Sequence, residues 1–148
     1  MSKYLSILTF IVLTASCKTQ DKATYSNQVI EVDILFSLKS TRCMGECPVY
    51  ELKIMSDSTI HFNGKKFTTV EGEANKKLSS EEYTKIMTII NEVEWSKLED
   101  KYDSQMSDLP SFNFVYKEKR IYQYGSKPKS LIKLRKDLLQ IIDSKDFF

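Results

Sequence analysis

The sequence predicts an α+β fold in which an antiparallel sheet carries two helices on one face, with the elements in the order β-β-β-β-α-β-β-α. Two observations predict this class. Apolar and polar residues alternate through two stretches, residues 29–70 and 112–124, which is typical of half-buried strands. Each stretch is followed by a segment with apolar residues at helical spacing, at about residues 79–94 and 131–142. Groups of strands that are each followed by a helix favour an α+β arrangement over a parallel α/β sheet.

The first alternating stretch predicts a four-stranded meander. Asn63-Gly64 is a dipeptide typical of a two-residue hairpin turn, so we expect the third strand to end there. Residues 67–70 are then expected to return as the fourth strand. The predicted apolar positions are Val32, Ile34, Phe36 and Leu38 in the first strand, Tyr50, Leu52 and Ile54 in the second, and Ile60 and Phe62 in the third.

Shorter signals place the remaining elements. Ser79 and Glu82 have the spacing of a capping box, which predicts a helix that begins there and runs to about Glu94. Residues 97–111 are rich in Asp and Ser and are expected to form a polar loop. The second alternating stretch predicts a hairpin. The closing helix is expected to bury a stripe of Leu131, Leu134, Leu138, Ile141 and Ile142.

Length and composition limit the possible partners. The chain has 148 residues, of which 41% are hydrophobic and 28% are charged, and its formal net charge is +2. This length suits one domain with a single core, and the composition excludes a disordered, collagen-like or polytopic membrane chain. The near balance of 22 basic and 20 acidic side chains argues against nucleic acid as a partner. The four scattered glycines form no phosphate-binding loop, and no cofactor is expected.

The first residues are typical of an export signal. A positive start at Lys3 is followed by a largely apolar run at residues 4–15. This run is too short for a membrane-spanning helix, which needs about 20 apolar residues, and polar residues follow it. One interpretation is a plain signal peptide that is cleaved near Ser16 and leaves Cys17 as a free thiol.

Small residues before the first cysteine favour a second interpretation. Leu13-Thr-Ala-Ser-Cys17 resembles the lipobox of bacterial lipoproteins, which implies lipidation of Cys17 and a permanent membrane anchor. We adopt it because an exposed free thiol is unfavourable in an oxidising compartment. Lys18 directly after the cysteine resembles lipoproteins that are sorted to an outer membrane. The predicted divisions are a lipoprotein signal peptide at residues 1–16, a lipidated cysteine with a flexible tether at 17–28, and a single α+β domain at 29–148.

Charge is unevenly distributed along the chain. Residues 71–108 contain 5 Lys and 10 Asp or Glu, a local charge of −5, whereas residues 117–145 contain 9 Lys or Arg and 3 Asp or Glu, a local charge of +6. The basic C-terminal region is a candidate surface for an anionic ligand or an envelope protein. An ordinary solvated helix and hairpin is the simpler explanation of the same charges.

Cys43 and Cys47 lie close together in the sequence and could form a disulfide, exchange thiols or bind a metal. These three interpretations of them remain open. The first is a structural disulfide, because Gly45 permits a tight turn and an exported domain meets an oxidising environment. The second is thiol–disulfide exchange, for which Cys-x-x-Cys at the start of a helix is the usual pattern. The third is a copper or zinc site that adds His61, the only histidine. We prefer the disulfide, since a strand follows Cys47 and a fourth metal ligand is not evident.

The segment around these cysteines resembles a known signature. Cys43-x-Gly-x-Cys-Pro-x-Tyr50 lies between two predicted strands and is similar to the motif of an uncharacterised bacterial family, domain of unknown function 6438, often found in exported lipoproteins. The similarity extends from about Ile30 to Asp143 and follows the family's order of hairpins, loop and helices. The resemblance implies an exported domain of this fold and no particular activity.

Together these observations predict a lipid-anchored protein of the bacterial cell envelope that acts as a binding or structural module. Spacing alone singles out neither paired acid–base carboxylates nor a Ser-His-Asp set, so we expect no catalytic residues. The alternative function is an envelope protein that handles thiols, copper or zinc through Cys43, Cys47 and His61. The predicted partners are the membrane, through the lipid anchor, and an unidentified anionic ligand or envelope protein.

Overall fold

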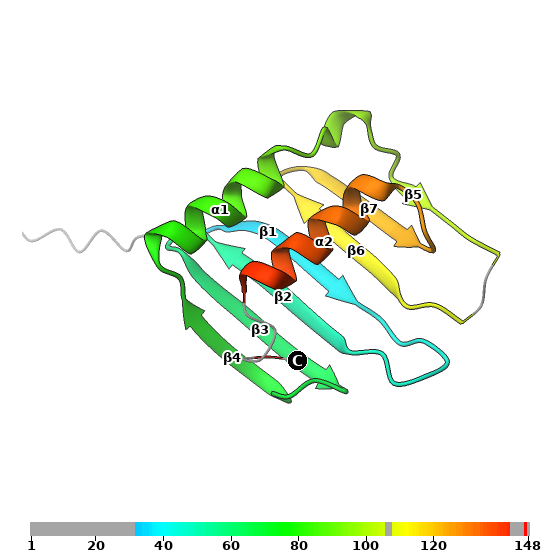
Figure 1. Cartoon of the computed structure of the whole chain (residues 1–148), viewed down its shortest axis with the longest axis horizontal. Coiled ribbons are helices and arrows are strands. Elements are labelled where there is room, and N and C mark those ends of the chain that lie inside the picture. Colours follow the sequence, from blue (N-terminus) through cyan, green and yellow to red (C-terminus); the bar gives the residue numbers. More distant parts are fainter. Residues whose placement is uncertain (1–31, 106–107, 143–146, 148) are drawn as a thin grey trace, which may run out of the picture. The chain divides into compact units, whose positions relative to one another are not determined.

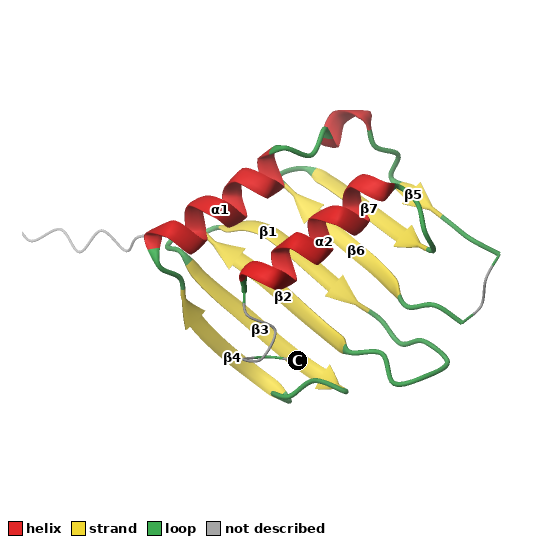
Figure 2. Cartoon of the chain, viewed as in Figure 1, coloured by secondary structure: helices red, strands yellow, loops and turns green. Residues whose placement is uncertain are grey.

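The computed structural model describes residues 32–105, 108–142 and 147. In these residues seven strands form one sheet in the order β4-β3-β2-β1-β6-β7-β5, and two helices lie over one face of the sheet (Figures 1 and 2). The predicted α+β class is therefore confirmed. The predicted signal peptide, the lipidated Cys17 and the tether lie outside the described residues.

Four strands from the first half of the domain form the predicted meander. β1 pairs with β2, β2 with β3, and β3 with β4, all of them antiparallel. The predicted apolar positions from Phe36 to Phe62 are buried. Val32 is 40% exposed because it precedes β1, and Ile34 is 53% exposed where the register of β1 shifts between Ile34 and Phe36. The bounds are Ile34–Ser40 for β1, Val49–Met55 for β2, Thr59–Lys66 for β3 and Gly72–Lys77 for β4.

The prediction of a hairpin turn at Asn63-Gly64 is wrong. Both residues lie inside β3, and Gly64 is paired with β2 on one side and β4 on the other. A Cβ atom at Gly64 would collide with the carbonyl oxygen of Val70 and the hydroxyl of Thr68. Glycine is therefore needed for a close approach of the β3–β4 connection, and not for a turn. The connection itself occupies residues 67–71, where a strand was expected.

Helix α1 (Ser80–Asn91) begins at the predicted capping box. The Glu82 amide donates to the Ser79 hydroxyl at 3.2 Å, and the Ser79 amide donates to the Glu82 carboxylate at 2.8 Å. The helix ends at Asn91, about one turn earlier than expected, and the short 3-10 helix η1 (Trp95–Lys97) follows. The Trp95 indole donates to the Ile90 carbonyl at 2.8 Å, which satisfies one of the free acceptors at the helix end.

The second hairpin joins the meander in the same sheet. β6 (Ser111–Tyr116) pairs with β7 (Lys119–Tyr124) as predicted, and β6 also pairs antiparallel with β1. The predicted purely antiparallel sheet of six strands needs a correction, because the expected loop supplies a seventh strand, β5 (Lys101–Tyr102), which pairs parallel with β7. Two residues are too few to show a period in the sequence. A hydrogen bond of 2.9 Å from the Tyr122 amide to the Asp100 carbonyl helps to hold this strand.

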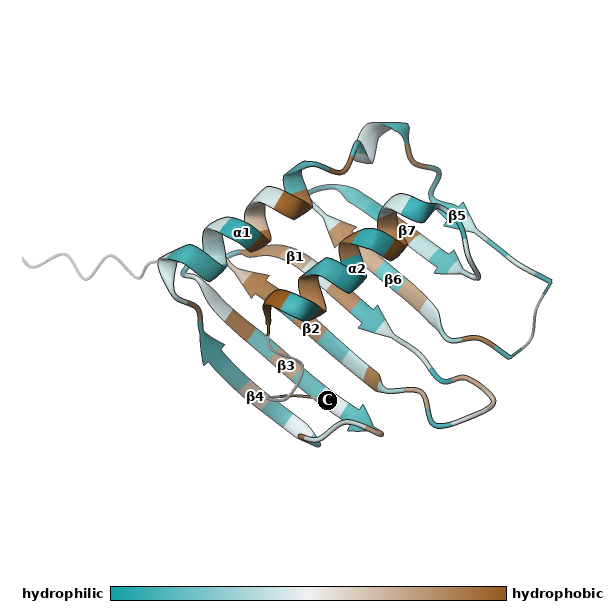
Figure 3. Ribbon diagram, viewed as in Figure 1, coloured by the Kyte–Doolittle hydropathy of each residue, from teal (hydrophilic) through white to brown (hydrophobic). Residues whose placement is uncertain are grey.

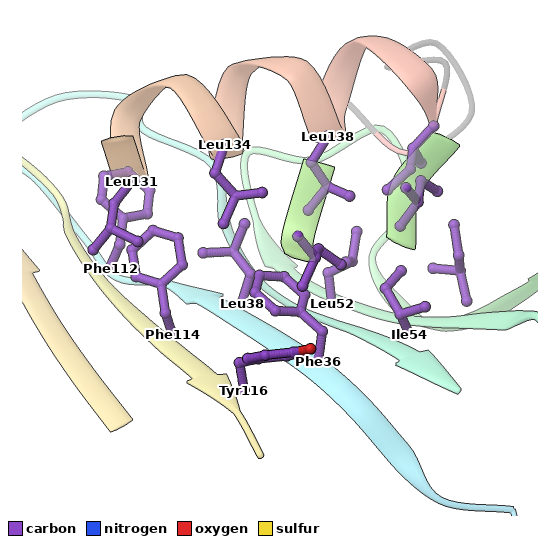
Figure 4. Close-up of a cluster of buried hydrophobic side chains, with 14 of the residues drawn as sticks. Phe36, Leu38, Leu52, Ile54, Phe112, Phe114, Tyr116, Leu131, Leu134 and Leu138 are labelled. Atoms are coloured by element: carbon purple, nitrogen blue, oxygen red, sulfur yellow. The ribbon is translucent and has the colours of Figure 1, made fainter. Parts of the chain in front are cut away.

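Helix α2 (Lys129–Ile141) lies beside α1, and both bury their apolar stripes on the same face of the sheet (Figures 1 and 3). In Figure 4 the leucines of α2 point down onto the strands. No helix of the described segments is long and apolar enough to cross a membrane. The buried core includes Ile86 and Ile90 of α1, Leu131, Leu134 and Leu138 of α2, and Phe36, Leu38, Leu52, Ile54, Phe112 and Phe114 of the sheet.

Replacing Ile90 by alanine is expected to lower the free energy of unfolding by about 2–4 kcal/mol, because its fully buried side chain leaves a cavity in the core. Ile89 is only partly buried, so Ile89→Ala is a matched control and is expected to cost less than half as much. Urea denaturation followed by circular dichroism measures both losses. Equal losses in the two variants would contradict the placement of α1 on the sheet.

Candidate functional site

A disulfide between Cys43 and Cys47 closes the connection from β1 to β2. The two Cα atoms are 5.8 Å apart, within the usual range for a disulfide, and the Gly45 amide donates to the Cys43 sulfur at 3.2 Å. Both cysteines are half-buried, whereas Met44 between them is 80% exposed. Of the three interpretations of this pair, the disulfide is the arrangement that the structure contains.

Hydrogen bonds dock the disulfide loop, residues 41–48, onto the start of β6. The Thr41 amide donates to the Ser111 carbonyl at 3.0 Å, and the Ser111 amide donates to the Thr41 hydroxyl at 3.0 Å. The Ser40 hydroxyl donates to the Pro48 carbonyl at 2.8 Å, which ties the two ends of the loop together. The loop is therefore held by the disulfide inside it and by β6 beside it.

A cavity of about 320 Å³ opens between the disulfide loop, the start of β6 and α2. Most of its wall is apolar, and it lies on the face of the sheet that the helices cover. Only one of its lining residues is charged. The cavity is lined by Ser40, Cys47, Pro48, Tyr50, Pro110, Phe112, Arg135 and Leu139.

Arg135 projects its guanidinium from α2 over the ring of Phe112. The central guanidinium carbon is 3.7 Å from the ring centroid, which is a close cation–π contact. The side chain is half-buried, and this burial lowers the pKa of Arg135 from its usual value, while the nearby Tyr50 acts in the opposite direction. The arginine stays charged under physiological conditions because its ordinary pKa is so high.

Tyr50 places a phenol in the wall of the same cavity. Its side chain is 3% exposed, and burial raises the pKa of Tyr50 to about 12, although the charge of Arg135 acts against this rise. The ring stacks on Phe62 with the centroids 5.8 Å apart, and Phe62 stacks on Phe147 at 4.5 Å. At physiological pH the phenol is therefore neutral and does not cancel the charge of Arg135.

His61 lies on the other face of the sheet from this cavity. It alternates with the buried Ile60 and Phe62 of β3 and is exposed, with Lys53 of β2 and Asn75 of β4 as its cross-strand neighbours. Within residues 32–105, 108–142 and 147, no three or more His, Cys, Asp or Glu side chains are grouped so that they could hold a metal ion. The structure therefore does not bring His61 together with the two cysteines.

A scan against protein-family models gives a match for this domain. Residues 34–142 match the family described as Domain of unknown function (DUF6438). The chain belongs to this family. Searches of the curated proteins and of the solved structures found no match.

The DUF6438 match contains the whole candidate site. The disulfide loop, the residues that line the cavity and Arg135 all fall within residues 34–142, whereas Cys17 does not. Membership of the family is therefore shown for the part of the chain that builds the cavity. The lipid anchor at Cys17 stays a prediction.

Sequence reasoning missed Arg135 as a site residue and counted it only among the charges of the basic C-terminal region. A signal was present, because Arg135 follows Leu131 by four residues and precedes Leu138 by three, which puts it on the buried stripe of α2. A charged residue on a buried stripe is informative, since such residues are rarely buried without a reason. Its contact with Phe112 could not be foreseen, because it depends on how α2 crosses β6.

The double variant Cys43→Ser, Cys47→Ser is expected to lower the free energy of unfolding by about 2 kcal/mol, because a loop this small restricts the unfolded chain only modestly. Urea denaturation of the variant and the oxidised wild-type protein measures the difference. Reduced wild-type protein is the matched control and should unfold like the variant. Recovery of free Cys43 and Cys47 from protein alkylated without a reductant would show that the disulfide does not form.

The wild-type chain is expected to lose stability at high pH, and the Tyr50→Phe variant is expected to lose less. The folded chain holds the Tyr50 proton up to about pH 12, whereas the unfolded chain releases it near the ordinary phenol pKa of 10.0. The stability that the buried, neutral phenol contributes is therefore intact below about pH 10. As the pH rises toward about 12, the free energy of unfolding of the wild-type chain falls by up to about 3 kcal/mol. Urea unfolding between about pH 8 and pH 11.5 compares the two chains. The same pH dependence in both would contradict the burial of the phenol.

Proposed function

We propose that this chain is an exported lipoprotein of the bacterial cell envelope, anchored through Cys17, whose domain binds a ligand or partner without catalysing a reaction. The lipobox-like segment Leu13–Cys17 supports the anchor, and Lys18 after it supports sorting to an outer membrane. The family match supports a shared domain and carries no activity. The proposed binding site is the cavity beside the disulfide loop.

The Cys43–Cys47 disulfide is the observation that carries this proposal. Disulfides persist in oxidising compartments outside the cytosol, so a bonded pair supports export of the domain. The chain has three cysteines, and pairing two of them leaves Cys17 as the remaining thiol. Lipidation of Cys17 would remove that thiol and would at the same time hold the domain at a membrane.

The chemistry of the cavity supports binding. Aromatic, proline and leucine side chains offer apolar contact area, and one guanidinium offers a fixed point for a polar group. Most small-molecule sites in proteins combine a largely apolar wall with a few polar groups in this way. The disulfide and the docking hydrogen bonds hold one wall in place, which lowers the entropy lost on binding.

Thiol–disulfide exchange is a second candidate function, favoured by one observation. Cys47 lines the cavity and is half-buried, so a thiol that enters the cavity has a path toward the disulfide. The expected difference is in redox behaviour, because a structural disulfide resists mild reductants and an exchanging one opens readily. Incubation with reduced glutathione followed by alkylation and mass measurement separates the two. The copper or zinc alternative has no such support in the described part of the chain.

Replacing Cys17 by serine is expected to abolish lipid attachment and membrane retention in a bacterial host, because serine has no thiol to acylate. Radiolabelled palmitate and fractionation of the cell measure the two effects. The wild-type precursor should accumulate in the presence of globomycin, an inhibitor of lipoprotein signal cleavage, and the variant should not respond.

The matched control for this prediction is the double variant Cys43→Ser, Cys47→Ser. It removes the two other cysteines and leaves Cys17 in place, so it is expected to keep the label and the membrane attachment. If Cys17→Ser incorporates palmitate and stays on the membrane as the wild-type protein does, the anchor proposal is wrong.

A further inference from the structure

Arg135 carries a positive charge that no acidic side chain of the described residues neutralises. The ion pairs within residues 32–105 and 108–142 do not include this guanidinium. The acidic residue nearest in sequence, Asp137, is bound to Lys133 at 2.5 Å on another side of α2. Tyr50 stays neutral at physiological pH because burial raises its pKa to about 12. A half-buried cation without a counter-charge is costly, and an anion that enters the cavity would offset that cost.

The stacked position of the Arg135 guanidinium leaves the N–H groups at its edge available to a ligand. One face of the planar group lies against the Phe112 ring, with 3.7 Å between the guanidinium carbon and the ring centroid. The N–H groups lie in the guanidinium plane, so stacking does not occupy them. Two parallel N–H bonds to one carboxylate are the geometry that arginine favours, and they are stronger where water is partly excluded.

The rest of the cavity selects against a purely ionic ligand. Pro48, Pro110, Phe112 and Leu139 supply apolar surface around the single cation. A multiply charged ligand such as phosphate would lose hydration against these walls with only one positive group in return. The volume of about 320 Å³ is at the small end of the range typical of ligand sites, so the apolar body must be compact.

We propose that the cavity between the disulfide loop, β6 and α2 binds a monocarboxylate with a compact apolar body, with the carboxylate on Arg135 and the body between Pro48, Pro110 and Phe112. This inference rests on the proposed function, because it names the ligand class of the same binding module. A free organic acid and the carboxyl end of a peptide with an apolar last residue present the same chemistry. The experiment therefore uses both.

The test is a titration of the full chain, as the cell makes it, in lipid nanodiscs. Phenylacetate represents the free acid and acetyl-glycyl-phenylalanine the peptide end, and nitrogen-15 NMR follows the Arg135 side-chain N–H and the Leu139 amide. Saturable shifts of both signals are expected with at least one of the two ligands, and the tighter ligand identifies the source. Phenylacetamide keeps the apolar body without the charge, and acetate keeps the charge without the body. Phenylacetamide is expected to bind at least about tenfold more weakly, since a charge-assisted pair contributes more than one factor of ten. Acetate is also expected to bind at least about tenfold more weakly, since it loses the apolar contact of the ring.

Two variants of α2 test the role of the arginine. Arg135→Gln is expected to weaken binding of the acid by at least about tenfold and to leave binding of phenylacetamide nearly unchanged. Lys136→Gln removes the same charge from an exposed neighbour on the same helix and is expected to bind like the wild-type chain. A circular dichroism melt confirms that both variants fold. If Arg135→Gln does not fold, the comparison of acid with amide on the wild-type chain still decides the question.

The inference is overturned if neither acid shifts the Arg135 signal, if phenylacetamide binds as tightly as phenylacetate, or if a folded Arg135→Gln chain keeps its affinity for the acid. These outcomes are separate from failure of the anchor. A Cys17→Ser chain that keeps its palmitate label would overturn the lipoprotein assignment, and it would still bind phenylacetate through Arg135.

Discussion

The pairing of β1 with β6 joins the two halves of this domain into one sheet. β1 has a meander strand on one side and a strand of the second hairpin on the other, and no short turn connects it to β6. Leu38 lies opposite Phe114 and Phe36 opposite Tyr116, so the pairing brings large apolar side chains together on one face. Without it the sheet would divide into a meander and a hairpin, each too small to bury the stripes of both helices.

The two ends of the β1–β6 pairing differ, and the difference places the site. At one end Trp95 stacks on Tyr116 with the centroids 5.1 Å apart, and the Tyr116 hydroxyl donates to the Asn91 side chain at 2.5 Å, beside an open pocket that is lined in part by the charged side chains of Glu94, Lys117, Glu118 and Lys119. At the other end Ser40 lies opposite Phe112, and the chain leaves β1 into the disulfide loop. The cavity at this second end has a largely apolar wall with Arg135 as its one charged lining residue.

Elements with strong local signals were predicted well, and elements that depend on distant partners were not. The capping box at Ser79 and the leucine stripe of α2 are defined by residues that are close in the sequence, and both are present in the structure. Asn63-Gly64 has the same local appearance as a hairpin turn, but Gly64 serves the close approach of Val70 and Thr68 from the next connection. β5 exists only because β7 offers it an edge.

The candidate site also has one part that the local sequence indicates and one part that it does not. The sequence favours the disulfide over its two alternatives, because Gly45 between Cys43 and Cys47 permits a tight turn, which is a local property. It does not indicate the cavity, whose walls come from the β1–β2 loop, β2, β6 and α2.

By itself the sequence determined the fold class and most of the elements, and it favoured a disulfide between Cys43 and Cys47, because periodicity, caps and spacing act between residues that are close along the chain. Only the tertiary structure decided where the second hairpin pairs, which glycine is a close contact and where Arg135 points. The hairpin pairing and the position of Arg135 depend on contacts between residues far apart in the sequence, and the close contact of Gly64 depends on the path that residues 68–70 take in the β3–β4 connection.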